Sequence, residues 1–184
     1  KSIEAFKEIS EDNISKILTN SIFYNYKIGQ PICRADVIPS KVLIILSGEA
    51  RIIHGSLEKT HTISILKSDQ FVGLASILRA EGCESVSASS EVMVMAIDDS
   101  IIIDLYLNDK SFKSWCDKKI QVAEAYVIAS KLHESSSKSD IELQESVQIL
   151  LSSMTLNTIN NDEIFQNNGD FVQILGSANV NQNK

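Results

Sequence analysis

A turn followed by a short apolar helix stands out at Ser68–Leu78, because its residue types could bind an anion. Gly73 lets the backbone approach a ligand closely, and the amides of Val72–Ala75 would be free at the start of the helix. Free N–H groups at a helix start, together with the helix dipole, favour negative charge. Arg79, the only arginine in or next to this stretch, would have to supply a guanidinium group. These residues predict a site for a small anionic ligand.

Two acidic residues next to this stretch oppose such a site. Glu81 and Glu84 would repel a phosphate group or neutralise the guanidinium of Arg79. The sequence therefore supports the anion-binding amides better than it supports a free positive charge beside them.

Catalytic and metal chemistry find little support in the sequence. His54, His61 and His133 have no metal-ligand spacing with each other or with a cysteine, and no paired catalytic carboxylates or nucleophile motif occur. His54 and His61 flank a predicted hairpin, so they could approach each other, and exposed hairpin histidines are the expected outcome. We therefore expect no enzyme, no catalytic residue and no metal site.

The composition is that of a globular chain with one domain and, at most, an appendage. The chain has 184 residues, 43% of them hydrophobic, and a net charge of −7, which disfavours broad binding to nucleic acid or anionic membranes. The longest wholly apolar run, Val42–Leu46, is far too short to span a bilayer. Three cysteines without CxxC spacing favour a reduced, cytoplasmic chain, or the cytosolic part of a membrane protein.

Hydrophobic periodicity predicts a mainly β protein with helices before and after the strands. Apolar residues at helical spacing indicate one or two helices across residues 2–20, and further helices across residues 99–133. Short alternating runs separated by Gly, Pro and Ser indicate strands for most of residues 21–98. Short strands at about ten-residue spacing are typical of an all-β sandwich or barrel.

These strands and turns resemble the cyclic-nucleotide-binding domains of the catabolite activator, protein kinase A and gated channel families. Val42–Ile52 is similar to a strand pair of that family, and Gly29, Gly48 and Gly73 fall at its turn glycines. Ser68–Leu78 is similar to its phosphate-binding cassette. The resemblance covers residues 14–132 and implies a domain over residues 1–133, built on an eight-stranded antiparallel β-roll similar to a jelly roll.

The resemblance also implies a ligand site, from which two positions depart. Leu74 stands where the family has a ribose-binding glutamate, and Gly82 stands where it has a phosphate-binding arginine. Cyclic nucleotide is therefore disfavoured as a ligand and no cofactor is certain, while retained binding of cAMP or cGMP, or of another small ligand, remains an alternative. The candidate ligand-binding residues are Val72, Gly73, Leu74, Ala75, Arg79, Ser85 and Val86.

The C-terminal part is expected to contain two more features. A helix over residues 109–132 carries an apolar stripe, and family members use such a helix as a dimer seam or as a lid, so we expect it to pack on the roll or on a second copy in a homodimer. Ser139 and Glu142 form a capping-box pattern that predicts a further helix over residues 139–154. Residues 155–184 are expected to be a polar linker or the start of a following domain.

Two functions compete. The first is a regulatory sensor or docking domain, the N-terminal fragment of a larger protein, for which an ABC-type toxin or bacteriocin exporter is the preferred guess. The second is the sensor half of a transcription regulator of the catabolite activator type. Such a regulator needs a basic DNA reader, whereas the only basic residue after Ser139 is Lys184. We therefore expect no nucleic-acid partner and no membrane segment within these residues.

Overall fold

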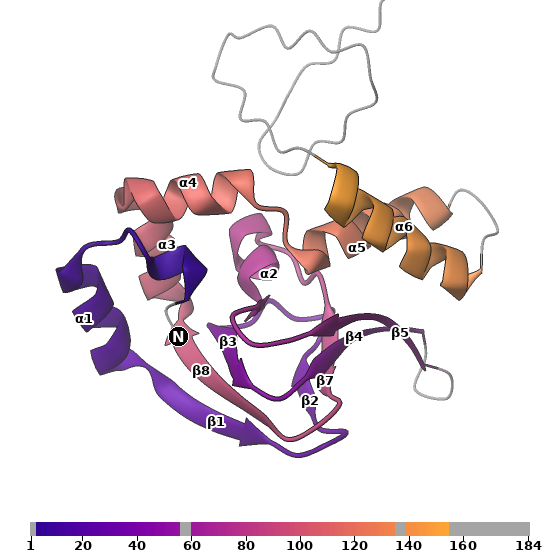
Figure 1. Ribbon diagram of the computed structural model, residues 1–184, viewed down its shortest axis with the longest axis horizontal. Helices are drawn as coiled ribbons and strands as arrows, with labels where there is room; N and C mark the ends of the chain where they lie inside the picture. Colours follow the sequence, from indigo (N-terminus) through magenta and orange to yellow (C-terminus); the bar gives the residue numbers. More distant parts are fainter. Residues whose placement is uncertain (1–2, 56–59, 135–138, 155–184) are drawn as a thin grey trace, which may run out of the picture.

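The computed structural model describes residues 3–55, 60–134 and 139–154, which form eight strands and seven helical segments (Figure 1). The strands are β1 (Ile22–Tyr26), β2 (Pro31–Cys33), β3 (Lys41–Ser47), β4 (Ala50–Gly55), β5 (Thr60–Leu66), β6 (Phe71–Val72), β7 (Ser85–Ala88) and β8 (Val92–Asp98). The helical segments are η1 (Glu4–Phe6), α1 (Glu11–Asn20), α2 (Leu74–Arg79), α3 (Asp99–Asn108), α4 (Lys110–Lys118), α5 (Val122–Glu134) and α6 (Asp140–Ser153).

The strands form two antiparallel sheets of four strands each. One sheet has the order β1-β8-β3-β6 and the other the order β2-β7-β4-β5, so neighbouring strands are mostly distant in sequence. This is the predicted eight-stranded antiparallel β-roll with flanking helices.

The continuous apolar run in β3 is explained by burial on both of its faces. Leu43 and Ile45 point into the core between the sheets, whereas Val42 and Ile44 point to the outer face, which the N-terminal and middle helices cover. A strand buried on one face only would show alternation, so a fully apolar run marks a strand that is covered on both sides.

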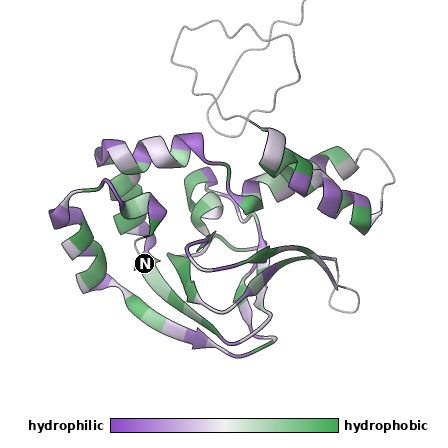
Figure 2. Cartoon of the chain, viewed as in Figure 1, coloured by the Kyte–Doolittle hydropathy of each residue, from purple (hydrophilic) through white to green (hydrophobic). Residues whose placement is uncertain are grey.

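Helices η1, α1, α3 and α4 cover the outer face of the first sheet, and aromatic side chains join them to it. Phe71 of β6 lies 5.2 Å from Trp115 and 6.1 Å from Phe6 between ring centroids. Phe112 of α4, which is fully buried, contacts Phe6 and Trp115 in turn. Green apolar residues alternate with purple polar ones along these helices (Figure 2).

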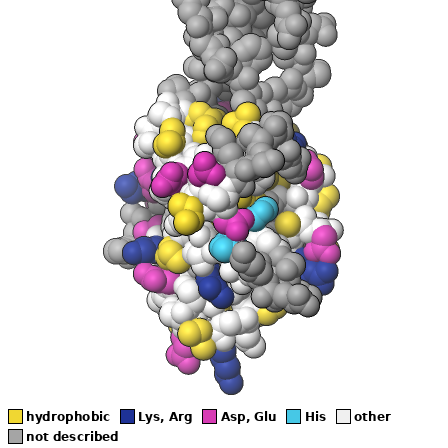
Figure 3. Space-filling view, turned by 90° about the vertical axis from the view of Figure 1, so that its right-hand side faces the viewer, with side chains coloured by type: hydrophobic (Ala, Val, Ile, Leu, Met, Phe, Trp, Pro, Cys, Tyr) yellow, Lys and Arg dark blue, Asp and Glu magenta, His cyan; other side chains and the backbone are white. Residues whose placement is uncertain are grey.

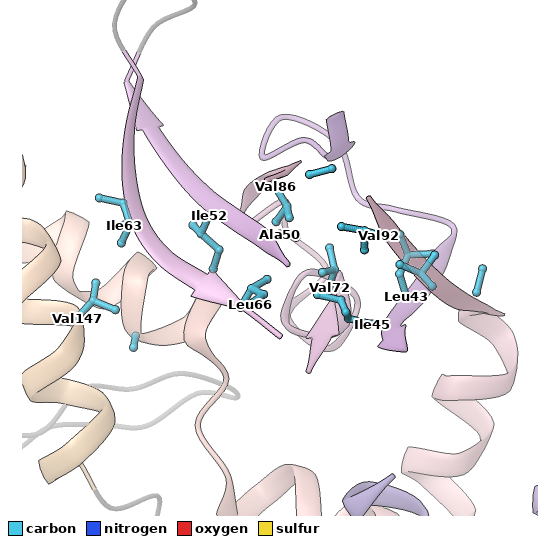
Figure 4. Close-up of a cluster of buried hydrophobic side chains, with 14 of the residues drawn as sticks. Leu43, Ile45, Ala50, Ile52, Ile63, Leu66, Val72, Val86, Val92 and Val147 are labelled. Atoms are coloured by element: carbon cyan, nitrogen blue, oxygen red, sulfur yellow. The ribbon is translucent and has the colours of Figure 1, made fainter. Parts of the chain in front are cut away.

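Helices α5 and α6 cover the roll on the side of the second sheet. Ala125 and Ala129 of α5 and Val147 of α6 are buried in the same cluster as the side chains of β4 and β5. Figure 4 shows Val147 close to Ile63 of β5. The predicted capping box is present at the start of α6, where the Ser139 and Glu142 side chains bond to each other's backbone N–H groups.

The prediction of one continuous helix over residues 109–132 is wrong. Lys119 is extended between α4 and α5, and the Glu124 carboxylate accepts a 2.9 Å hydrogen bond from the Gln121 backbone N–H, which starts a new helix. In the apolar stripe, Ala123 is buried, while Trp115 and Cys116 are only partly buried.

Two further findings concern the chain's ends and its relation to membranes. The predicted linker at residues 155–184 lies outside the described residues. Within the described ranges, none of the helices combines the length and the apolar character needed to cross a bilayer.

Candidate functional site

The turn before α2 adopts the backbone geometry that the sequence predicts for close approach of a ligand. Gly73 is the N-cap residue of α2 and has φ +84°, in the left-handed region that favours glycine. A Cβ built on Gly73 would lie 2.9 Å from Pro39 Cγ and 3.2 Å from the Lys41 carbonyl oxygen. Glycine is therefore needed here for both its conformation and its small size.

The backbone N–H of Gly73 is already bound by a side chain of the same domain. It donates a 2.5 Å hydrogen bond to Oε1 of Glu84, whose side chain is almost completely buried. Burial raises the pKa of Glu84 to about 7, and the nearby Glu124 adds to this, while the Gly73 N–H acts in the opposite direction. A buried carboxyl group thus takes the amide at the start of α2.

Further hydrogen bonds close the loop at residues 80–84 onto α2. The backbone N–H of Glu81 donates to the Ser76 carbonyl oxygen at 3.1 Å, and the N–H of Cys83 donates to Ser76 Oγ at 3.0 Å. Ser76, which is fully buried, therefore ties the loop to α2 through both its carbonyl and its hydroxyl oxygen.

Arg79 lies at the end of α2, away from the contact between Gly73 and Glu84. Its Nη1 atom is buried and has no hydrogen-bond partner among the described residues. Its positive charge lowers the pKa of the buried Cys83 thiol and of Glu124, although burial raises both pKa values overall. Arg79 is thus close enough to Glu124, in the first turn of α5, for the two charges to interact.

The predicted ligand-binding residues are close together, but most of their side chains are buried in the protein core. Leu74 lies in the cluster beneath the outer helices, and Ala75 packs against Cys83 and Ala123. Ser85 Oγ accepts a 3.2 Å hydrogen bond from the Ala35 backbone N–H. Val72 and Val86 are buried between the sheets. The role of all these residues in ligand binding stays a prediction.

Gly82, which stands where the resemblance implies an arginine, has no room for any side chain. A Cβ at this position would lie 2.2 Å from the Ala35 carbonyl oxygen and 3.1 Å from the Val37 backbone nitrogen. The loop between β2 and β3 therefore packs directly on the backbone of Gly82.

The roles of Glu84 and Glu124 at this turn were not predicted from the sequence. Glu84 was expected to oppose a phosphate, and the structure shows that its carboxyl group binds the turn itself. The signal was the position of an acid immediately before a strand whose other residues are small or apolar. Glu124 had no such signal, because it lies in a stretch expected to be mid-helix.

The hairpin histidines lie opposite each other, as the sequence suggested, and each contacts a covering helix. His54 Nδ1 lies 2.7 Å from the Tyr126 hydroxyl of α5, and His61 Nε2 lies 2.9 Å from Asp140 Oδ2 of α6. Figure 3 shows histidine side chains beside acidic ones on this face. Among the described residues, no three histidine, cysteine or acidic side chains gather in a way that could hold a metal ion.

Comparisons with known proteins agree with this architecture. Residues 24–109 match the family model of the cyclic nucleotide-binding domain. A search of curated proteins gives no match. Among solved structures, the match to the Thermus thermophilus catabolite activator protein covers 77% of this chain and 62% of that protein, at 19% identity and a TM-score of 0.51. The match to the regulatory subunit of a cAMP-independent protein kinase A from Trypanosoma brucei covers 79% of this chain and 47% of that subunit, at 14% identity and a TM-score of 0.52.

These findings define the fold of the domain. It is the β-roll shared with both solved structures, although the chain spans less than two thirds of either of them. The match to the cyclic nucleotide-binding domain family covers residues 24–109, which is just under half of the chain.

Proposed function

We propose that this chain is a regulatory sensor or docking domain that does not hold cAMP or cGMP in the usual way of its family. The observation that carries this proposal is the hydrogen bond between the buried Glu84 carboxyl group and the Gly73 backbone N–H. By the resemblance, the amides at this turn would contact the phosphate of a cyclic nucleotide. A phosphate would have to displace Glu84, and an ionised carboxylate beside it would repel it.

The two departures from the family pattern support the same proposal. Leu74 is 1% exposed, so its side chain contributes to the core and offers no group to a ribose. Gly82 cannot be replaced by a longer residue without displacing the backbone at Ala35. Loss of a charge-assisted phosphate contact and a ribose carboxylate weakens binding by several kcal/mol, at about 1.4 kcal/mol per tenfold in affinity.

The covering helices indicate how such a domain could act without a nucleotide. α5 and α6 are packed on the roll through Ala125, Ala129 and Val147. The Trypanosoma brucei structure with this fold belongs to a cAMP-independent kinase regulator, so the fold also serves regulation that does not depend on cAMP. We infer that the output of the domain passes through the position of α5 and α6.

The test is calorimetric titration of cAMP and cGMP into the wild-type chain, Glu84→Ala, and Glu81→Ala as a control. Glu81 is an exposed acid in the same loop, so its removal changes the charge without freeing the Gly73 amide. We expect no saturable heat at micromolar nucleotide for the wild type or the control. Binding that appears in Glu84→Ala would identify Glu84 as the obstacle. Micromolar binding by the wild type, abolished by Arg79→Ala, would contradict the proposal.

The partner of the domain is a separate question. An ABC-type exporter stays the preferred proposal, and a transcription regulator of the catabolite activator type stays the alternative. The gene sequence after Lys184 distinguishes them, since a basic helix-turn-helix and a set of membrane spans with a nucleotide-binding motif are easily told apart.

A further inference from the structure

The two sheets have four edge strands, and two of them are too short to pair well with another chain. β6 has only two residues, and β2 has three residues and begins with Pro31. β5 is longer, and α6 packs on one of its faces through the core and through the contact between His61 and Asp140. Short length and proline are usual means by which proteins block sheet edges.

The fourth edge, β1, has none of these protections. It pairs with β8 on one side, and no strand of the described chain pairs with its other side. Its sequence Ile-Phe-Tyr-Asn-Tyr contains no charge and no proline. Ile22, Phe23 and Tyr24 are 48%, 59% and 38% exposed, which is unusual for three consecutive large apolar or aromatic residues in a strand. An uncharged, apolar and unpaired edge of this kind favours addition of another strand.

We propose that β1 is a docking edge for a second copy of this chain, through antiparallel pairing of the two β1 strands about a twofold axis at Tyr24. This inference concerns assembly, and it does not depend on whether the domain binds a nucleotide. Joining the β1 edges of two copies would combine the β1-β8-β3-β6 sheet of each copy into one continuous sheet of eight strands. A twofold axis makes the same patch serve both copies, which is the commonest arrangement in homodimers.

The side chains of β1 are complementary to themselves in this register. Tyr24 lies opposite its counterpart, and Tyr26 lies opposite the partner's Ile22, twice by symmetry. Aromatic residues opposite β-branched ones are favourable cross-strand pairs. Tyr24 and Tyr26, with Asn25, Gln30 and Pro31, also line a shallow open hollow beside the strand, next to the position of the partner's Ile22.

Charge also fits a second copy. The chain carries a net charge of −7, so most faces of two copies would repel each other. From Ser21 to Lys27 the only charged residue is Lys27. The proposed register sets Lys27 opposite the partner's Ser21, about 20 Å from the partner's Lys27 at ~3.4 Å per residue. Pairing at β1 therefore brings no like charges together.

The expected dimer is weak. Stable interfaces bury about 1,600 Å² in total, and an interface made by two five-residue strands with their side chains is small by comparison. The test is sedimentation velocity over a concentration series up to high micromolar, with Phe23→Lys and Tyr24→Lys as edge variants. Leu107→Lys is the matched control, because Leu107 is 69% exposed on α3. Leu132→Lys tests the alternative seam through α5, where Leu132 is 55% exposed.

We expect a wild-type monomer–dimer equilibrium, at least a tenfold weaker dimer in both edge variants, and no change in either Leu→Lys variant. The thermal unfolding midpoint of each variant shows whether it is folded. A cysteine at the twofold position gives an independent measurement: Tyr24→Cys should form an interchain disulfide under mild oxidation, whereas Leu107→Cys should not. A wild-type chain that stays monomeric at high micromolar concentration would overturn the proposal. A dimer that the edge variants leave intact, or one that only Leu132→Lys disrupts, would also overturn it.

Discussion

His54 and His61 lie directly opposite each other on β4 and β5, yet each is bound to a different helix. His54 contacts the Tyr126 hydroxyl of α5, and His61 lies against Asp140 at the start of α6. One cross-strand pair thus connects the hairpin to both covering helices.

The contact between His61 and Asp140 should stabilise the docked α6. A double-mutant cycle with His61→Gln and Asp140→Asn, measured by urea unfolding, isolates this contribution from the effect of Asp140 on the helix dipole. Since both side chains are about one third exposed, we expect a coupling of about 0.5–1 kcal/mol. A coupling of zero within error would mean that this contact does not hold α6 on the roll in solution.

Glu84 should make the domain less stable as pH rises through neutrality. Its pKa is raised from 4.5 to about 7 in the folded protein, so between these values the folded state holds a proton that the unfolded state has lost. This contribution to stability is fully present below pH 4.5 and is lost as pH rises through about 7. At 1.36 kcal/mol per pKa unit, it amounts to on the order of 3 kcal/mol.

Glu84→Gln keeps an acceptor for the Gly73 N–H and removes the titration. We expect the free energy of unfolding of this variant, relative to wild type, to increase between pH 5 and pH 8. Glu81→Gln, at an exposed position in the same loop, should run parallel to wild type. If the Glu84→Gln curve also runs parallel, the carboxyl group is not buried in solution.

Two glycines with the same backbone conformation should respond differently to alanine. Gly29 has φ +81° and no atom within 4 Å of a built Cβ, whereas Gly73 has φ +84° and close contacts to Pro39 and Lys41. Gly29→Ala should therefore cost only the left-handed backbone strain, about 1–2 kcal/mol. Gly73→Ala should cost this amount plus that of a steric clash. Comparable losses in chemical denaturation would show that the turn at Gly73 can widen.

The sequence was sufficient to predict the roll because its strands are short, apolar and clearly separated by turn residues. The run Val42–Leu46 was correctly assigned to a strand, although its two-sided burial could not be foreseen. That burial depends on helices α1, α3 and α4, which pack on it from distant parts of the chain. The break at Lys119–Gln121 was missed because the apolar stripe continues through it, while the cause of the break is a local hydrogen bond from Gln121 to Glu124.

The candidate site was harder to predict for a related reason. The turn at Gly73 follows from local sequence, since a left-handed glycine before a short helix has a local signature. The partner of its amide is a side chain eleven residues later, and the space around Gly82 is set by Ala35 in another loop. Both relationships are tertiary. Residue types near the turn could therefore suggest an anion site, but they could not show that the Glu84 carboxyl group already accepts the hydrogen bond from Gly73.

The last prediction concerns whether α6 belongs to the core of the domain. Val147 is fully buried against the roll, whereas its neighbour Gln148 is exposed. Val147→Ala should therefore lower the free energy of unfolding by about 1–3 kcal/mol, from lost burial and the cavity left behind. Gln148→Ala, one position along the same helix, should change it by less than about 0.5 kcal/mol. A single unfolding transition shifted by Val147→Ala, with loss of α6 amide protection only on global unfolding, would show that α6 folds with the roll. The opposite outcome is a Val147→Ala variant that is as stable as wild type and whose α6 amides exchange freely. It would show that the helix detaches without disturbing the β-roll, and that packing of Val147 near Ile63 is not needed for the stability of the domain.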